Sequence, residues 1–451
     1  MRNLFRYTLL AFLLGQTGIA QPAPLTADQD HAQLLHVLGI ENLRRGADGN
    51  ADSPFAANTD ETKANAALTS LPPLLQSVGG RPIASATDWE ANRPALLNTF
   101  SQEIYGYVPG VAPELHWQAG STTPLANSGA AAVRQRFTTT LVHPENAALN
   151  LSLNFTLVLP KSNKPVPVVV VMSFDPGIWE RFRDRMPAER YAQILADNAR
   201  WRKQVVNAGW GYAEIIPTEF QADSGDGLSQ GIIGFVNNGK PRNPTDWGAL
   251  RAWAWSASQV LTYLQTDSRV AANKISVHGH SRFGKAALVA MAFDSRFAAG
   301  FISSSGEGGA KLWRRNFGEQ IGNIAGAGEY HWMAGNFVKY AGPQTVSDLP
   351  VDAHQLLALC APRPLLVSVG SQGESWVDPK GMLLAAYHAT PAYTLFGEKG
   401  VTQNELPPVG NGLLAGKLAF RQHEGGHTPA PNWKTFINFA SRQWESPNKH
   451  K

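Results

Sequence analysis

The sequence predicts an α/β fold, with a mostly parallel central sheet flanked by helices in a three-layer αβα sandwich. Val166–Met172 is a continuous β-branched run and similar short runs recur along the chain, a pattern typical of strands buried on both faces of a parallel sheet. Helical patterns lie between these runs, and the alternation predicts βαβ units. The runs are Val166–Met172, Gly211–Ile216, Lys274–His278, Ala299–Ser303 and Pro364–Val369, and the clearest helical pattern is Trp247–Leu264.

The residues before these runs predict a different arrangement. Ala131–His143 and Leu149–Pro160 are rich in Val, Thr, Leu and Phe, which favours antiparallel strands, and a helical pattern precedes them at Trp89–Phe100. Residues 21–65 are rich in Ala, Asp and Asn with weak periodicity, so we expect a loosely structured lead-in there. Residues 66–446 are expected to form a single domain.

The N-terminus has the pattern of a secretory signal peptide. A basic stretch, Met1–Arg6, is followed by the apolar run Tyr7–Leu14 and by the small residues Gly18–Ala20. We predict cleavage after Ala20 and an exported protein, periplasmic or secreted. The run is shorter than the roughly 20 residues that span a bilayer, so we expect no membrane attachment after cleavage. The alternative is a buried N-terminal helix.

Composition narrows the classes of function. Hydrophobic residues make up 43% of the 451 residues and charged residues 16%, which is typical of a globular protein. The formal net charge is +4 and no long run of like charges occurs, so we expect no nucleic-acid partner. The single cysteine, Cys360, lies in an apolar stretch and is predicted to be a buried structural thiol.

The segment Lys274–Ala292 carries the chemistry. It predicts strand, sharp turn and helix, with Ser281 at the turn, Gly279 two residues before it and Gly284 three residues after it. This arrangement is a nucleophile elbow, which presents a serine hydroxyl above the sheet of an α/β-hydrolase fold. The common pattern places the second glycine one residue earlier. The alternative is a plain tight turn with an N-capping serine.

A serine nucleophile needs a base, and the base needs an acid that orients it. In this fold the chain order is serine, acid, histidine. His427 follows a strand-like segment and two glycines, whereas its competitor His423 is expected within or at the edge of that strand. Glu374 comes soon after the strand Pro364–Val369 and is the preferred acid. Asp378 precedes Pro379, which favours a helix-capping role.

Two residues beside the nucleophile suit the same chemistry. Arg282 follows Ser281 directly, so its backbone N–H is the expected oxyanion donor, and its guanidinium adds a positive charge. Lys285 lies one helical turn beyond Ser281 on the same face, where it can point toward a substrate.

The sequence resembles the glucuronoyl esterases, carbohydrate esterase family 15. The elbow Gly279–Lys285 is similar to the family signature G-x-S-R-x-G-K, which accounts for the late glycine. The similarity extends over residues 89–444, and several further motifs of this sequence resemble those of bacterial members. These motifs are Phe317–Glu319, His331–Trp332, Leu349–Leu359, Ala361–Pro364 and Trp376–Gly381.

The resemblance implies hydrolysis of the ester between 4-O-methyl-glucuronic acid of glucuronoxylan and a lignin alcohol. We expect a monomer, and acyl transfer to a serine needs no metal or organic cofactor. Ser281 and His427 match the family's nucleophile and base, and Arg282 matches its oxyanion arginine. The positions that match sugar- or uronate-binding residues are Lys285, Glu319 and Trp376.

One departure concerns the acid. Many members place it after the next strand, where this sequence has Ser304; Glu374 matches the acid of other bacterial members, and Glu307 is a further alternative. Two other functions stay open at this point: an esterase with a different acyl specificity, such as an acetyl xylan esterase, and a catalytically inactive carbohydrate-binding protein.

Overall fold

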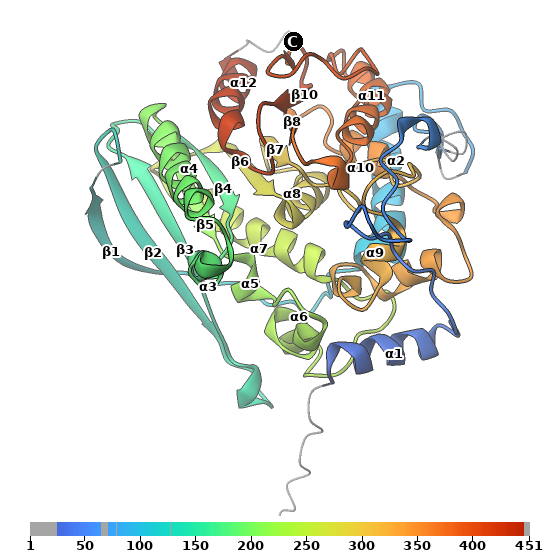
Figure 1. Ribbon diagram of the computed structural model, residues 1–451. Coiled ribbons are helices and arrows are strands. Elements are labelled where there is room, and N and C mark those ends of the chain that lie inside the picture. The colour runs from blue at the N-terminus through green and yellow to red at the C-terminus, as the bar shows by residue number, and fades with distance from the viewer. Residues whose placement is uncertain (1–24, 65–70, 78, 127, 446–451) are drawn as a thin grey trace, which may run out of the picture.

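A ten-stranded sheet runs through the described part of the molecule, in the order β1-β2-β3-β5-β4-β6-β7-β8-β10-β9 (Figure 1). The structure is a computed structural model that describes residues 25–64, 71–77, 79–126 and 128–445; the predicted signal peptide and its cleavage point lie outside them. The strands are β1 Gln118–Leu125, β2 Ala132–Leu141, β3 Leu151–Pro160, β4 Val166–Met172, β5 Gly211–Ile215, β6 Val270–His280, β7 Ala299–Ser303, β8 Leu365–Gly370, β9 Gly412–Leu413 and β10 Leu418–His423.

Strand direction divides the sheet into two parts. From β5 through β4, β6, β7 and β8 to β10 the neighbours pair in parallel. At one end β1, β2 and β3 pair antiparallel with one another and with β5, and at the other end β9 pairs antiparallel with β10. The sheet is therefore mostly parallel, as the sequence predicts, and the parallel strands bring their carboxyl ends to one edge.

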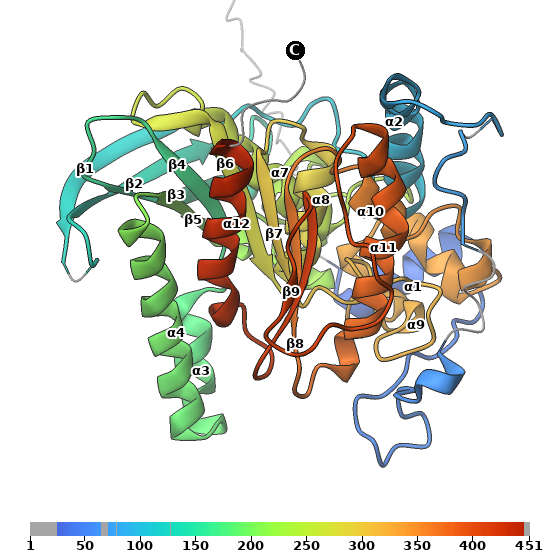
Figure 2. The same cartoon turned by 90° about the horizontal axis from the view of Figure 1, so that it is seen from above.

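Helices cover both faces of the sheet, because strand residues alternate between the two sides. In β4, Val168 and Val170 face one apolar cluster, whereas Val169 and Val171 face the other. The second cluster is closed by α4 (Ala188–Asn207) and α12 (Trp433–Glu445), which lie next to each other (Figure 2). The first is closed by α7 (Ala249–Leu264), α8 (Arg282–Phe293), α10 (Ala353–Ala358) and α11 (Pro379–Leu395).

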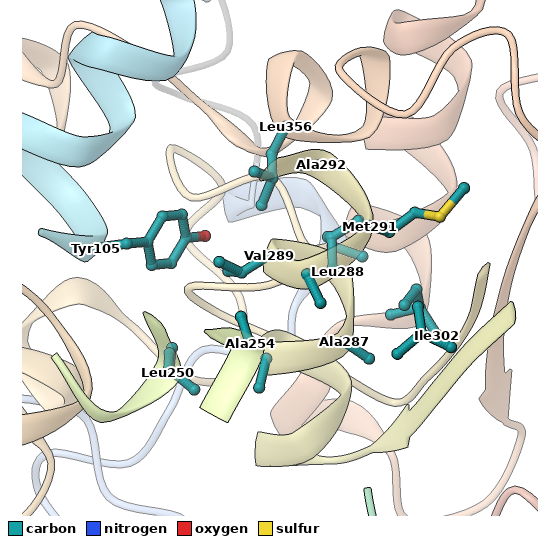
Figure 3. Close-up of a cluster of buried hydrophobic side chains, with 14 of the residues drawn as sticks. Tyr105, Leu250, Ala254, Ala287, Leu288, Val289, Met291, Ala292, Ile302 and Leu356 are labelled. Carbon is teal, nitrogen blue, oxygen red and sulfur yellow. The ribbon is translucent and has the colours of Figure 1, made fainter. Parts of the chain in front are cut away.

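The helix α8, which begins directly after Ser281, is embedded in the core (Figure 3). Its apolar side chains are fully buried and pack among residues of other elements. Each large apolar side chain buried in this way contributes about 1.5–3 kcal/mol. This packing anchors the turn at Ser281. The residues are Ala287, Leu288, Val289, Met291 and Ala292 of α8, with Tyr105, Leu250, Ala254, Ile302 and Leu356 around them.

The sequence predicts a loosely structured lead-in over residues 21–65, but the described residues 25–64 of this segment include a capped helix and specific contacts with the body. Helix α1 (Ala27–Val37) begins at a capping box on Thr26. The Tyr330 hydroxyl donates to Asp30 at 2.8 Å, and the Arg44 guanidinium donates to the carbonyl of Tyr340 at 2.6 Å. These partners are about 300 residues away in the chain, so local periodicity does not reveal them.

The remaining helices are short or lie at the margin of the sandwich. They are α2 (Ala86–Phe100), α3 (Pro176–Phe182), α5 (Pro217–Phe220), α6 (Gly231–Val236) and α9 (Ile321–Ala325). No helix in the described ranges is long and apolar enough to cross a membrane. Cys360 is fully buried, as predicted, and burial raises the pKa of its thiol to about 11.

Candidate active site

Ser281 occupies a strained turn between β6 and α8. Its φ of 57° and ψ of −129° lie in a region that non-glycine residues rarely adopt. The glycines on either side permit this turn because other backbone atoms approach them closely. A Cβ on Gly279 would lie 1.9 Å from the carbonyl oxygen of Phe283, and one on Gly284 would lie 2.7 Å from that of Ser303. The late glycine of the elbow therefore makes room for the end of β7.

The elbow is held in place by hydrogen bonds to its neighbours. The Ser281 N–H donates to the Ser303 carbonyl at 2.9 Å, which joins the turn to β7. Arg282 is the first residue of α8, so its backbone N–H has no carbonyl partner within the helix. A free N–H at a helix N-terminus is suited to stabilise negative charge. The turn thus combines a hydroxyl with an adjacent backbone donor.

His427 and Glu374 meet at the carboxyl edge of the sheet. Glu374 follows β8 and His427 follows β10, and these strands pair in parallel with His423 opposite Gly370. The Nδ1 atom of His427 lies 2.6 Å from Oε1 of Glu374. Gly425, with φ of 94°, provides the sharp turn before His427 that the glycine pair predicts. The Glu374 side chain is 2% exposed and that of His427 41% exposed.

The surroundings of Glu374 favour its ionised form. Burial raises the pKa of this carboxyl, but the hydrogen bond and charge of His427, together with the Ser304 hydroxyl, lower it by more, so that the pKa falls below its ordinary value. Ser304 lies where many relatives are expected to carry the acid. In this chain the carboxylate at His427 comes instead from Glu374, after the next strand of the sheet.

The ring of His427 also lies beside His280, the residue before the nucleophile. The two ring centroids are 4.3 Å apart. Nδ1 of His280 lies 3.3 Å from the Ser303 hydroxyl. Burial, followed by the charge of His427, lowers the pKa of His280 well below its ordinary value, so this ring is neutral near pH 7. The contact brings the imidazole of His427 to the elbow.

The competing residues have other partners. Asp378 caps α11 through the Gly381 N–H at 2.8 Å and pairs with the Arg315 guanidinium, also at 2.8 Å. Glu307 pairs with Lys311 in the interior. His423 is the last residue of β10, as expected, and is fully buried, with Nδ1 2.8 Å from the Asn432 amide. Of the three carboxylates considered, Glu374 is the one that contacts His427.

Lys285 and Glu319 form a buried pair next to the elbow. The ammonium of Lys285 donates to Oε2 of Glu319 at 2.8 Å and to the Glu307 carbonyl at 2.6 Å. Both side chains of the pair are 4% exposed. The Glu319 N–H donates to the carbonyl of Trp376 at 2.8 Å, which places Trp376 beside this pair. The three residues predicted to bind sugar are thus connected to one another by hydrogen bonds.

A network that the sequence did not reveal holds Arg282. Asp223, in the segment between α5 and α6, forms an ion pair with the Arg282 guanidinium. The same carboxylate accepts hydrogen bonds from Nε2 of His331 at 3.0 Å and from Nε1 of Trp332 at 2.6 Å. Burial raises the pKa of Asp223, but His331, Arg282 and Trp332 lower it well below its ordinary value. The signal in the sequence that could have identified Asp223 is its position beyond the carboxyl end of β5, the edge at which ligands bind in such sheets.

Glu329 is a second residue that sequence reasoning missed. It lies two residues before His331 and interacts electrostatically with Glu319, Lys285 and Arg282. One of its carboxyl oxygens is buried without a hydrogen-bond partner among the described residues. Burial, reinforced by the charge of Glu319, raises its pKa to about 7. Its proximity to the motif His331–Trp332 was the signal that pointed to it.

Comparisons with known proteins agree with this geometry. Residues 242–397 match a family model described as fungal glucuronyl esterase. A glucuronoyl esterase of family CE15 from Teredinibacter turnerae is 91% identical with a TM-score of 0.92, and the match covers 93% of this chain and 100% of that one.

More distant relatives match over most of their length as well. A carbohydrate esterase from an unknown prokaryotic organism is 30% identical, over 86% of this chain and 92% of its own. A 4-O-methyl-glucuronoyl methylesterase from Schizophyllum commune is 25% identical, over 83% and 82%. With an α/β-hydrolase fold and these relatives, the chain belongs to carbohydrate esterase family 15, the glucuronoyl esterases.

Proposed function

We propose that this chain is a serine esterase that hydrolyses glucuronoyl esters at Ser281, the reaction for which its relatives are named. The observation that carries the proposal is the contact of His427 with both Glu374 and the ring of His280 at the elbow. Because Nδ1 of His427 is committed to Glu374, Nε2 is the nitrogen left for the Ser281 hydroxyl.

The reaction proceeds by two acyl transfers. Ser281 attacks the C6 carbonyl of the uronate while Nε2 of His427 takes the hydroxyl proton, and the developing oxyanion is stabilised by the Arg282 N–H and guanidinium. His427 then gives this proton to the departing alcohol. In the second step His427 takes a proton from water, the water oxygen attacks the acyl carbonyl, and the uronic acid leaves as the Ser281 hydroxyl is restored. Glu374 stabilises the imidazolium in both steps.

We assign sugar binding to the charged group next to the elbow. Lys285, Glu319 and Glu329 offer donors and acceptors for the hydroxyl groups of the uronate, and Trp376 offers an aromatic face. Such a site suits a polyhydroxylated acyl group better than an acetyl group, which has no hydroxyl groups to bind. Hydrolysis rates on benzyl glucuronate and on acetylated xylan separate the two, and faster release of acetate would overturn the assignment.

The catalytic assignment is tested by replacing the nucleophile. Ser281→Ala should abolish turnover of benzyl glucuronate while the thermal unfolding midpoint stays close to that of the wild type. Ser276→Ala is the matched control, because this serine lies in β6, the strand that leads to Ser281, and makes only a 3.5 Å hydrogen bond to the Val168 carbonyl. Turnover that survives in Ser281→Ala would refute the assignment.

We further propose that the natural substrate joins glucuronoxylan to lignin alcohols and that the protein is an exported monomer. The signal-peptide pattern of residues 1–20 supports export. N-terminal sequencing of the mature protein should begin at Gln21, and retention of the leader would contradict export. Light scattering should give the mass of one chain.

A further inference from the structure

Asp223 is a carboxylate whose three hydrogen bonds come from two other elements of the fold. Oδ1 accepts from the side chains of His331 and Trp332, and Oδ2 accepts from Nη1 of Arg282. Its side chain is 17% exposed, so the three contacts are mostly shielded from water. A carboxylate with two neutral donors and one cation is fixed in position and in orientation.

Arg282 needs such a constraint. Its long side chain is 40% exposed, and a free arginine loses about 2 kcal/mol of rotamer entropy when it is ordered. Within the described part of the chain, its guanidinium hydrogen-bonds Asp223 alone, and its carbon Cζ lies 5.4 Å from the centre of the Trp332 ring. Asp223 therefore holds one terminal nitrogen and leaves the other available to a substrate.

The neutral donors on Asp223 affect the charge of the site. His331 and Trp332 also donate to the Asp223 carboxylate. This carboxylate therefore neutralises less of the positive charge of Arg282 than a carboxylate paired with Arg282 alone would. The same Trp332 ring lies 5.3 Å from the ammonium of Lys285. One indole thus donates to Asp223 and contacts both cations of the site.

We propose that Asp223 is a positioning residue of the esterase, which acts through Arg282 by holding its guanidinium where the oxyanion develops. The proposal rests on the oxyanion role of Arg282 in the proposed function. Asp223 contacts no reacting atom in this scheme. Its removal should lower kcat and change KM little, because the oxyanion exists only in the transition state.

The test is a double-mutant cycle with benzyl glucuronate as substrate. Asp223→Asn should lower kcat by about 100-fold in the wild-type background, the effect of a misplaced catalytic group. In the Arg282→Met background the same substitution should lower kcat less than about twofold, because the group it positions is absent. Asp226→Asn is the matched control: it lies in the same segment but accepts from the Ala27 N–H, so its kcat should equal the wild-type value.

The outcomes separate the proposal from the function on which it rests. Equal losses of kcat in both backgrounds would mean that Asp223 only supports the fold and does not act through Arg282. No loss of kcat in the wild-type background would also overturn the proposal. Thermal unfolding of each variant identifies a folding defect. If Arg282→Met itself keeps the wild-type kcat, the oxyanion role of Arg282 fails, whereas retained turnover in Ser281→Ala would refute the nucleophile independently.

Discussion

Nδ1 of His427 lies 2.6 Å from Oε1 of Glu374, although the two residues reach this point from different strands. The contact fixes the imidazole tautomer and places a negative charge beside the imidazolium of the reaction. Glu374→Gln should keep the shape but lose this charge, and kcat on benzyl glucuronate should fall by about 10³–10⁴-fold. Glu424→Gln, an exposed change in the same loop as His427, should leave kcat unchanged. Similar rates in both variants would contradict the assignment.

His280 supports the base from the other side. Its ring lies against that of His427, so His280→Ala removes a contact that orients the base. We expect kcat to fall by about 10- to 100-fold, as for a base displaced by a fraction of an ångström. Steady-state kinetics and the unfolding midpoint measure this together. A variant that is folded and fully active would show that Glu374 alone orients His427.

The buried pair of Lys285 and Glu319 should couple strongly in stability. Lys285→Met leaves the Glu319 carboxylate buried without its cation, which destabilises a fold by about 3–5 kcal/mol. Adding Glu319→Gln removes the uncompensated charge, so the double variant should be more stable than Lys285→Met alone. Urea unfolding of the three variants measures the coupling. Additive losses would show that the pair contributes no specific interaction.

Glu329 predicts a pH dependence of stability. Its pKa of about 7 in the fold lies above the value of about 4.3 for an exposed glutamate. Between these values the folded protein holds a proton that the unfolded chain has released, so the free energy of unfolding falls as pH rises from about 4 to 7. Glu329→Gln removes this contribution, and its unfolding midpoint should depend less on pH than that of the wild type. Parallel pH curves would contradict the raised pKa.

The sequence predicted the parts of the fold that depend on local patterns. β4 and β7 have the predicted bounds, because short runs without charged residues that are buried on both faces leave a continuous signal, which is strongest in the β-branched run of β4. Strand β1, Gln118–Leu125, is mostly exposed, and no alternation in its sequence predicts a strand. Its pairing with β2 defines it as a strand.

The same distinction holds for the site. Ser281 and the glycines of the elbow are neighbours in the chain, so one short segment of sequence is enough to predict their geometry. Asp223 reaches Arg282 across 59 positions, and a lone aspartate in a loop has no periodicity. The choice between Glu374, Asp378 and Glu307 also needed coordinates, because all three are acidic residues near the ends of strands and only their contacts distinguish them.

Covalent labelling reports whether Ser281 is an activated nucleophile. A fluorophosphonate reacts with a serine that has a working base and oxyanion site. Peptide mapping by mass spectrometry should find one phosphonyl group, on Ser281, at a rate that matches the loss of esterase activity. Complete inactivation with the label on any other residue would mean that Ser281 is not the nucleophile.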